Sequence, residues 1–253
     1  MAIIKTEAVI LKCSNYREKS KIITFYSRSH GKMRGIAKGV RDVKSRWGGV
    51  LQSMASVNLM FYYNENRTLH LISGADFAKS YQYIYDDFEK MQVGYRIVEL
   101  INKTTEDHHE NNALFELLTN SLNSLNDATK NYVNVLFNFE FRLMKILGFE
   151  IDLSFFEAGS TEKVIDKFPK NNYNSNIVNE GNSEYGHNCL THGDIKTLNL
   201  LNEGNYNLVM NLNIPKSSEN MLDRFFDNYF KSHFDNLHFS NTKKVINSKE
   251  IYL

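Results

Sequence analysis

Cysteine and proline are scarce in this sequence, with two of each among 253 residues. Cys13 and Cys189 lie far apart and form no framework spacing, which argues against a small disulfide-stabilised secreted fold. No run of about 18 apolar residues occurs, so a membrane-spanning helix is not expected. The N-terminal residues include the charged Lys5 and lack the apolar core of a signal peptide. These absences predict a cytoplasmic protein with reduced thiols.

Motifs that carry chemistry are also missing. The sequence has no glycine-rich phosphate loop of the Walker or dinucleotide type, and no serine or cysteine stands in a nucleophile elbow. His108 and His109 make a weak metal site, because neighbouring residues on a helix point about 100° apart. We predict that His108, His109 and Glu110 form a polar surface between two helices, and that the protein is not an enzyme. A hydrolase without a recognisable motif is a distant alternative.

The net charge of +1 conceals an uneven distribution. Residues 1–50 contain twelve Lys/Arg and three Asp/Glu, whereas the remaining 203 residues contain 18 Lys/Arg and 26 Asp/Glu. Such asymmetry is typical of a polyanion-binding module joined to an acidic or neutral one. The alternative is a solvated basic face without a ligand.

The hydrophobic pattern predicts an α+β chain of two domains. Short alternating or β-branched segments, separated by turn residues, indicate five strands at 7–12, 21–26, 33–38, 57–63 and 68–72. Five short strands in residues 1–80 suit a small closed barrel, of which the OB-fold is the commonest kind that binds nucleic acid. We therefore expect an OB-fold DNA-binding domain over 1–80 and an all-helical domain over 81–253.

Helical periodicity begins after Lys79. One apolar face is expected from Ile84, Phe88, Met91, Tyr95 and Val98. Further helices are expected at 112–125, 131–147, 194–201 and 219–233, and Gly148 is placed to end the third with a positive φ. Residues 150–192, rich in Asn, Ser and Gly, are expected to be an irregular insertion.

The most informative stretch is GKMRGIAKGVRDVKSR at 31–46. Glycines allow tight turns, and flexible cations reach phosphate oxygens without reading base sequence. The predicted phosphate-binding residues are Lys32, Arg34, Lys38, Arg41, Lys44 and Arg46. Tyr16 and Trp47 are candidates to stack on bases, although Trp47 is equally suited to anchor the core. An exposed basic loop that only keeps the protein soluble is the alternative.

These residues carry a resemblance to a known family. Thr6, Glu7, Ala8, Tyr16, Glu18, Ser20, Gly31, Lys32, Lys38, Gly39, Arg41, Lys44, Ser45 and Arg46 stand in register with the pattern of the RecO family of bacterial recombination mediators. Weaker similarity continues at 139–149 and 222–234. The resemblance implies an N-terminal OB-fold, binding of single- and double-stranded DNA, and annealing of complementary strands. It also implies complex formation with RecR, contact with the C-terminal tail of single-stranded-DNA-binding protein, and help in loading RecA.

The sequence departs from the four-cysteine zinc site that many members of the family carry. Phe156 and Gly159 stand where the first pair is expected, and only Cys189 and His192 remain of the second. Two ligands cannot close a tetrahedral site, so neither zinc nor another cofactor is expected. Arg142 and Lys145 are candidates to bind the acidic, aromatic protein tail. An RNA-binding OB-fold and a protein adaptor without nucleic-acid binding remain the alternative functions.

Overall fold

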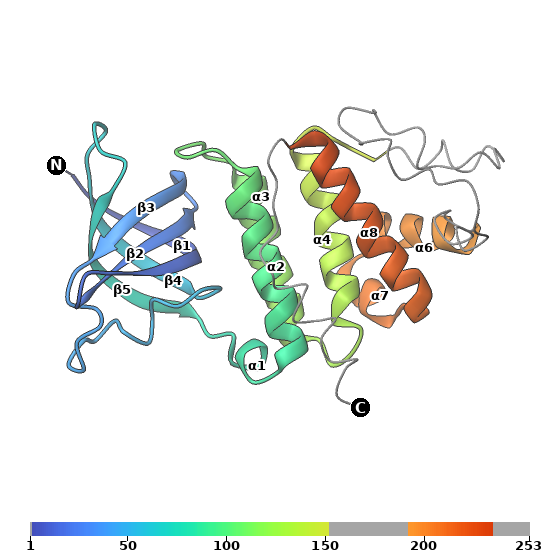
Figure 1. The fold of residues 1–253 in the computed structure, drawn as a ribbon, viewed down its shortest axis with the longest axis horizontal. Coiled ribbons are helices and arrows are strands. Elements are labelled where there is room, and N and C mark those ends of the chain that lie inside the picture. The colour runs from blue at the N-terminus through green and yellow to red at the C-terminus, as the bar shows by residue number, and fades with distance from the viewer. Residues whose placement is uncertain (1, 152–191, 235–253) are drawn as a thin grey trace, which may run out of the picture. The chain divides into compact units, whose positions relative to one another are not determined.

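The computed structural model describes residues 2–151 and 192–234, in which a five-stranded sheet precedes the helices (Figure 1). The strands are β1 (Ala2–Tyr16), β2 (Ser20–Ser27), β3 (Gly31–Ala37), β4 (Ser56–Tyr63) and β5 (His70–Lys79). The α+β prediction and its five strands are confirmed. β1 is longer than predicted because two strands pair with it in succession: residues 2–9 pair with β4 and residues 8–16 pair with β2.

The sheet closes in the strand order β1-β2-β3-β5-β4. Every pairing is antiparallel except β3 with β5, where Gly35 pairs with His70 and Ile36 with Leu71. The alternation of β4 places Val57, Leu59 and Phe61 inward, and each is at most 1% exposed. Side chains from all five strands fill the interior, together with Val40, Leu51 and Ala55 of the β3–β4 connection.

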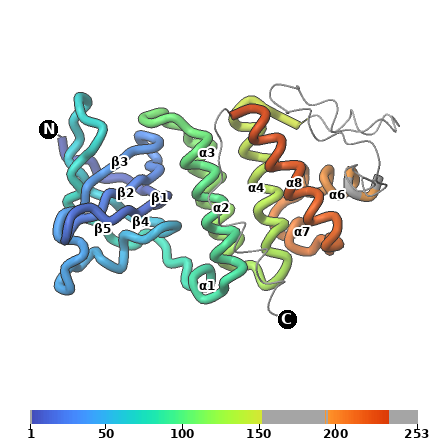
Figure 2. Tube along the Cα trace, in the orientation of Figure 1, coloured from blue at the N-terminus to red at the C-terminus, as the bar shows by residue number. Residues whose placement is uncertain are grey.

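Three helices follow the barrel: α1 (Gln82–Tyr85), α2 (Phe88–Thr104) and α3 (Asn112–Asp127). Asp87 begins α2 by accepting hydrogen bonds from the backbone N–H groups of Glu89 and Lys90. Asn111 begins α3 in the same way, with its side chain accepting from the N–H of Leu114. Figure 2 follows the chain from β5 through α1 into α2.

The predicted apolar face of the first long helix is wrong. Ile84 and Val98 are buried, whereas Phe88 and Tyr95 are 41% and 39% exposed. Ile84 lies in α1, and Asp87 caps the start of the separate helix α2. The five predicted residues therefore do not lie on one continuous helix and do not share one face. The buried side of α2 carries Val93, Ile97 and Ile101 instead.

The described chain divides into two compact units, one up to Tyr132 and the other from Val133. The first unit therefore holds α1 to α3 together with the barrel. The second holds nearly all of α4 (Tyr132–Ile146) with α6 (His192–Glu203), α7 (Tyr206–Asn211) and α8 (Lys216–His233). Of these, α7 was not predicted from the sequence.

Aromatic packing and buried amides hold the second unit together. The ring of Phe226 in α8 stacks on Phe137 and meets Phe141 edge-on, with centroids 5.7 and 4.8 Å apart. Asn134 donates to the carbonyls of Val209 and Leu212, so α4 fixes the position of α7.

The helix end predicted at Gly148 is confirmed. Gly148 takes a φ of +85°, a conformation that glycine adopts without steric conflict. Its N–H donates to the carbonyl of Lys145, and the N–H of Phe149 donates to that of Met144. This pair of bonds satisfies carbonyls that the helix end leaves free.

Candidate nucleic-acid interface

Two loops of the barrel form a basic surface: the β1–β2 turn at residues 17–19 and the β3–β4 connection at 38–46. We call this the loop surface. Its exposed cations are Arg17, Lys19, Lys38, Arg41, Lys44 and Arg46. Only Glu18 and Asp42 oppose them, so the surface carries an excess of four positive charges.

Hydrogen bonds join the two loops. The backbone N–H of Arg41 donates to the carbonyl of Lys19 at 3.1 Å, and the Arg41 guanidinium donates to the carbonyl of Arg17 at 3.1 Å. The Lys19 ammonium pairs with Asp42 at 3.4 Å. Arg17 and Lys19 are not among the predicted phosphate-binding residues, although they lie in the turn between two predicted strands, where exposed cations can bind a ligand.

The remaining cations of the loop surface face solvent. Within residues 2–151 and 192–234, no ion pair or side-chain hydrogen bond involves the side chains of Lys38, Lys44 or Arg46. The connection from 38 to 46 runs as successive turns rather than a helix, with Gly39 at a φ of +67°. The side chains of Lys38, Lys44 and Arg46 can therefore contact phosphates without first breaking a contact in the described part of the fold.

Lys32 differs from the other predicted phosphate-binding residues. Its side chain is 12% exposed, and its ammonium donates to the carbonyls of Asn102, at 2.9 Å, and Thr105. These carbonyls lie at the C-terminus of α2, where the helix dipole favours a cation. Lys32 therefore attaches β3 to α2, and we do not include it among the residues proposed to bind phosphates.

Arg34 shares a carboxylate with Lys32. Asp107, in the α2–α3 connection, lies 3.4 Å from the Lys32 ammonium and 3.2 Å from the Arg34 guanidinium. The Arg34 side chain is still 48% exposed, and a guanidinium carries five N–H donors. Arg34 can therefore contact a ligand at the edge of the barrel while it remains paired.

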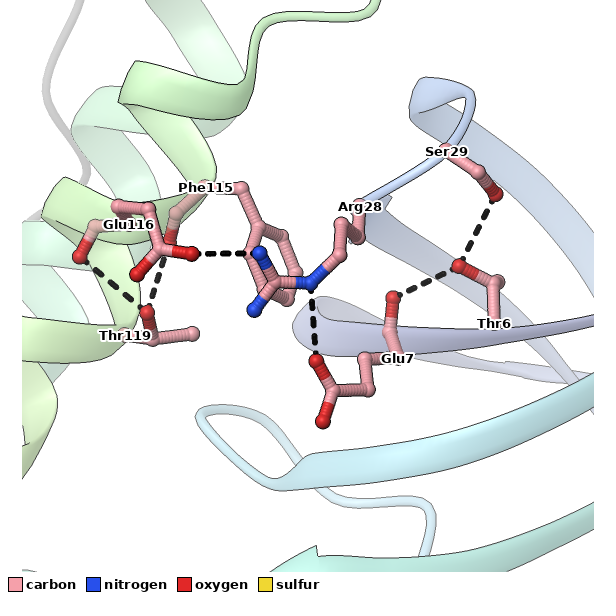
Figure 3. A network of polar contacts seen from close by, with 7 residues as sticks. All are labelled: Thr6, Glu7, Arg28, Ser29, Phe115, Glu116 and Thr119. Carbon is pink, nitrogen blue, oxygen red and sulfur yellow. Dashed lines mark hydrogen bonds and ion pairs between the residues drawn. The ribbon is translucent and has the colours of Figure 1, made fainter.

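Arg28, a further cation of the basic N-terminal segment, is engaged on two sides (Figure 3). Its guanidinium pairs with Glu7 of β1 at 2.9 Å and with Glu116 of α3, and it lies 4.4 Å from the centre of the Phe115 ring. The two carboxylates neutralise it, so Arg28 fastens the barrel to α3.

The two candidate stacking residues lie in different environments. Trp47 is partly buried and packs against the barrel core, which favours its role as an anchor. Tyr16 is half-buried at the end of β1, with the Arg17 guanidinium 5.3 Å from its ring centre. Tyr16 is therefore next to the loop surface.

The histidine run lies between two helices, as predicted, and contacts the barrel. The N–H of His108 donates to the carbonyl of Lys32, and the His108 ring meets His70 edge-on at 5.9 Å. His30 lies 5.3 Å from Tyr63, whose ring stacks on His70 at 5.2 Å. Burial, followed by the neighbouring His108, lowers the pKa of His70, and a backbone hydrogen bond at Tyr62 opposes the shift.

The proposed tail-binding cations both have partners in the second unit. Arg142 donates to the carbonyl of Gly204 at 3.0 Å and lies over the Tyr206 ring at 5.2 Å. Lys145 pairs with Glu150 at 2.6 Å and keeps a side chain that is 62% exposed. Arg142 thus supports the connection between α6 and α7, and Lys145 is the more accessible cation.

The remaining predictions concern metals and membranes. Cys189 lies outside the described residues, so the expected loss of the zinc site stays a prediction; His192 begins α6. In the described ranges, no three His, Cys, Asp or Glu side chains are grouped to hold a metal ion. Among the same residues, every helix is too short or too polar to cross a membrane.

Comparison with known proteins identifies the family. Residues 1–81 match the model described as "Recombination protein O N terminal", and residues 85–241 match "Recombination protein O C terminal". Proteins named "DNA repair protein RecO" from Chloroherpeton thalassium and Pelodictyon phaeoclathratiforme are 33% and 35% identical over 148 and 151 residues. These matches cover 58% and 60% of this chain and 57% and 58% of the relatives, less than two thirds of their length.

A more distant relative extends the match. The protein of the same name from Thermoanaerobacter sp. is 23% identical over 235 residues, which cover 93% of this chain and 94% of the relative. Since the two family models together span residues 1–81 and 85–241, this chain belongs to the RecO family.

Proposed function

We propose that the chain is a DNA repair mediator that binds single- and double-stranded DNA through the loop surface and anneals complementary strands. The observation that carries this proposal is the excess of four positive charges on two loops that hydrogen bonds hold together. Annealing by such a surface needs no catalytic group, because neutralised phosphates lower the repulsion between strands and base pairing supplies the free energy. The protein is accordingly proposed not to be an enzyme.

We further propose that the barrel is an OB-fold over residues 1–80. Its five strands and the single parallel pair of β3 with β5 support this assignment, because an OB-fold is a five-stranded Greek-key barrel. OB-folds bind single strands through surface loops and strand faces, which is consistent with the position of the loop surface.

The partners are proposed from the family. With RecR, the protein would help load RecA onto strands coated by single-stranded-DNA-binding protein, in the cytoplasm. The helical domain, 81–253, would bind the C-terminal tail of the coating protein, with Lys145 as the accessible cation. Lys145→Glu is a cleaner test than a change at Arg142, because Arg142 also holds Gly204.

Binding measured against salt tests the function. If about four to six cations contact duplex phosphates, log K should fall with log salt at a slope near −4 to −5. Replacing Lys38, Arg41 and Lys44 together by Ala should weaken binding of every sequence and remove annealing, with little change in the unfolding midpoint. A slope near zero contradicts DNA binding and favours a protein adaptor. Stronger binding to RNA than to DNA of the same sequence favours the RNA-binding alternative.

A further inference from the structure

One side of α2 carries apolar side chains that remain exposed. We call these residues the α2 stripe: Phe88, Met91 and Tyr95, whose spacings of three and four place them on one side of the helix. Phe88 is 41% and Tyr95 is 39% exposed, and Met91 is partly exposed. Most residues of α2 after Tyr95 are buried. Exposed apolar side chains grouped on a helix that is otherwise mostly buried indicate an interaction surface.

Acidic side chains lie beside the stripe. In residues 81–95, Asp86 and Glu89 are exposed and Asp87 is partly exposed. The one cation of that range, Lys90, is 6% exposed, and its ammonium donates to the backbone carbonyl of Asn126 at 2.9 Å. The accessible charge next to the stripe is therefore negative. It favours a partner that carries cations among its apolar side chains and disfavours an acidic one.

Residues 242–253 of the same chain have the complementary composition. This segment, TKKVINSKEIYL, lies outside the described residues and beyond the family match that ends at residue 241. It contains three lysines, one glutamate and five apolar or aromatic side chains. Lys243 and Lys244 directly precede Val245 and Ile246, so positive charge and apolar side chains stand together. The segment thus has both properties that the surroundings of the α2 stripe favour.

Attachment to the same chain favours this segment over a separate molecule. A segment joined to its site by a short connection acts at an effective concentration on the order of millimolar. Residues 235–241 alone stand between the last described residue and the segment. A second copy of the protein, present at a far lower concentration, would occupy the same surface less often. The segment of the same chain is therefore the favoured occupant.

We propose that residues 242–253 dock on the α2 stripe. Their apolar side chains cover Phe88 and Tyr95. Their lysines lie beside the carboxylates of Asp86 and Glu89. Docking engages three lysines, so it withholds them from nucleic acid and leaves phosphate binding to the barrel. The proposal goes beyond the proposed function and is independent of it, because this contact within the chain needs no ligand.

Trypsin cleavage of the full chain tests the proposal, because proteolysis follows the fraction of molecules in which a site is undocked. Intact mass gives the rate of cleavage after each lysine of the segment, which are Lys243, Lys244 and Lys249. A synthetic peptide of residues 239–253 gives the rate without docking. The wild-type chain should be cleaved at these lysines about ten-fold more slowly than the peptide, or slower still.

Variants of the stripe separate its apolar and charged parts. The double variant Phe88→Ser, Tyr95→Ser removes the exposed rings, and its cleavage rate should come within about two-fold of that of the peptide. Glu89→Lys reverses one exposed charge, and the chain should be cleaved about two-fold faster than the wild type, or more, at low salt. Ile3→Ser is the control, because Ile3 is 58% exposed on β1, and it should match the wild type.

Three outcomes overturn the proposal. The first is a wild-type chain that is cleaved as fast as the peptide, because the segment is then undocked. The second is a double variant that keeps the urea midpoint and the protection of the wild type, because the segment then docks elsewhere. The third is protection that decreases when the wild type is diluted, because the occupant of the stripe then comes from a second copy.

Discussion

The side-chain ammonium of Lys32 donates a hydrogen bond of 2.9 Å to the carbonyl oxygen of Asn102 in the last turn of α2. A residue from the most basic stretch of the sequence is thus occupied by the fold. Lys44, from the same stretch, is exposed on the loop surface. The two lysines should therefore respond in opposite ways to the same substitution.

Lys32→Ala should lower the free energy of unfolding by about 1–3 kcal/mol, because hydrogen bonds from a charged donor and an ion pair are lost from a nearly buried site. Its affinity for DNA should stay within about two-fold of the wild type, on the order of the 0.5 kcal/mol expected of neutral substitutions. Urea unfolding followed by the fluorescence of Trp47, the single tryptophan, measures the first quantity.

Lys44→Ala is the matched change for the ligand. It should leave the unfolding midpoint unaltered and weaken binding of all DNA sequences, with the salt slope reduced by about 1. The distinction drawn between the two lysines is wrong if Lys32→Ala weakens DNA binding at unchanged stability.

Two glycines with nearly the same backbone conformation should differ sharply in their tolerance of alanine. Gly31 and Gly39 have φ angles of +63° and +67°. A Cβ at Gly31 would lie 2.0 Å from the backbone oxygen of His109, whereas nothing lies within 4 Å of a Cβ at Gly39. Gly39→Ala should therefore lower the free energy of unfolding by about 1–2 kcal/mol, the energy that a left-handed conformation costs a residue with a Cβ.

Gly31→Ala should cost at least about 2 kcal/mol more than Gly39→Ala, because the backbone of the α2–α3 connection must move. Urea midpoints of the two variants, compared with that of the wild type, measure the difference. Equal losses would show that the connection does not lie against β3 as described.

Removing a carboxylate from the loop surface should strengthen DNA binding. The backbone N–H of Lys44, and then the Lys19 ammonium, lower the pKa of Asp42, so it is ionised at neutral pH. Asp42→Asn frees Lys19 and removes a negative charge from the loop surface, so affinity for DNA should rise about two- to five-fold at low salt. The gain should shrink as salt screens the surface. Asp76→Asn, an exposed change on β5, is the control and should have little effect.

Acid should destabilise the barrel through His70. Burial lowers the pKa of this imidazole below its ordinary value of 6.5, so the unfolded state binds more protons than the folded state once the pH falls below about 7. Neutral His70 contributes its full share of the free energy of unfolding above the unfolded-state pKa. This contribution is lost as the pH decreases toward the pKa of His70 in the folded state. The free energy of unfolding should therefore fall as the pH decreases through 6.5, the ordinary pKa of histidine, toward the lower pKa of the folded state.

His70→Phe should flatten this dependence, since phenylalanine fits beside Phe61 and Tyr63 and does not titrate. Burial also lowers the pKa of His30, with Glu110 opposing the shift, so a smaller dependence should persist in the variant. If the stability of the variant depends on pH as strongly as that of the wild type, groups other than His70 cause the loss of stability in acid. Urea midpoints at four or five pH values provide the measurement.

Local signals in the sequence predict most of the strands and helices. Strand β4 was predicted at 57–63 and is found at Ser56–Tyr63, because its alternating side chains must face either the core or solvent. Helix α4 was likewise predicted with its terminal Gly148, since a glycine after an apolar period ends a helix locally. Helix α7 was missed, because six residues present too little periodicity.

The functional assignment of individual cations needed the folded chain. Lys32 and Lys38 stand in one basic run and cannot be told apart by composition. In the structure Lys32 is nearly buried beneath the end of α2, while Lys38 is exposed in the β3–β4 connection.

Membership of the family, the order of strands and helices, and the concentration of positive charge in the first fifty residues all follow from the amino-acid sequence alone. These properties depend on residue type and short-range period, which are written along the chain. The tertiary structure decided which cations remain available, since Asn102, Asp107 and Glu116 reach the barrel from helices and a connection far along the chain. A charge is free for a ligand only if the fold does not already neutralise it, and that depends on distances between residues remote in sequence.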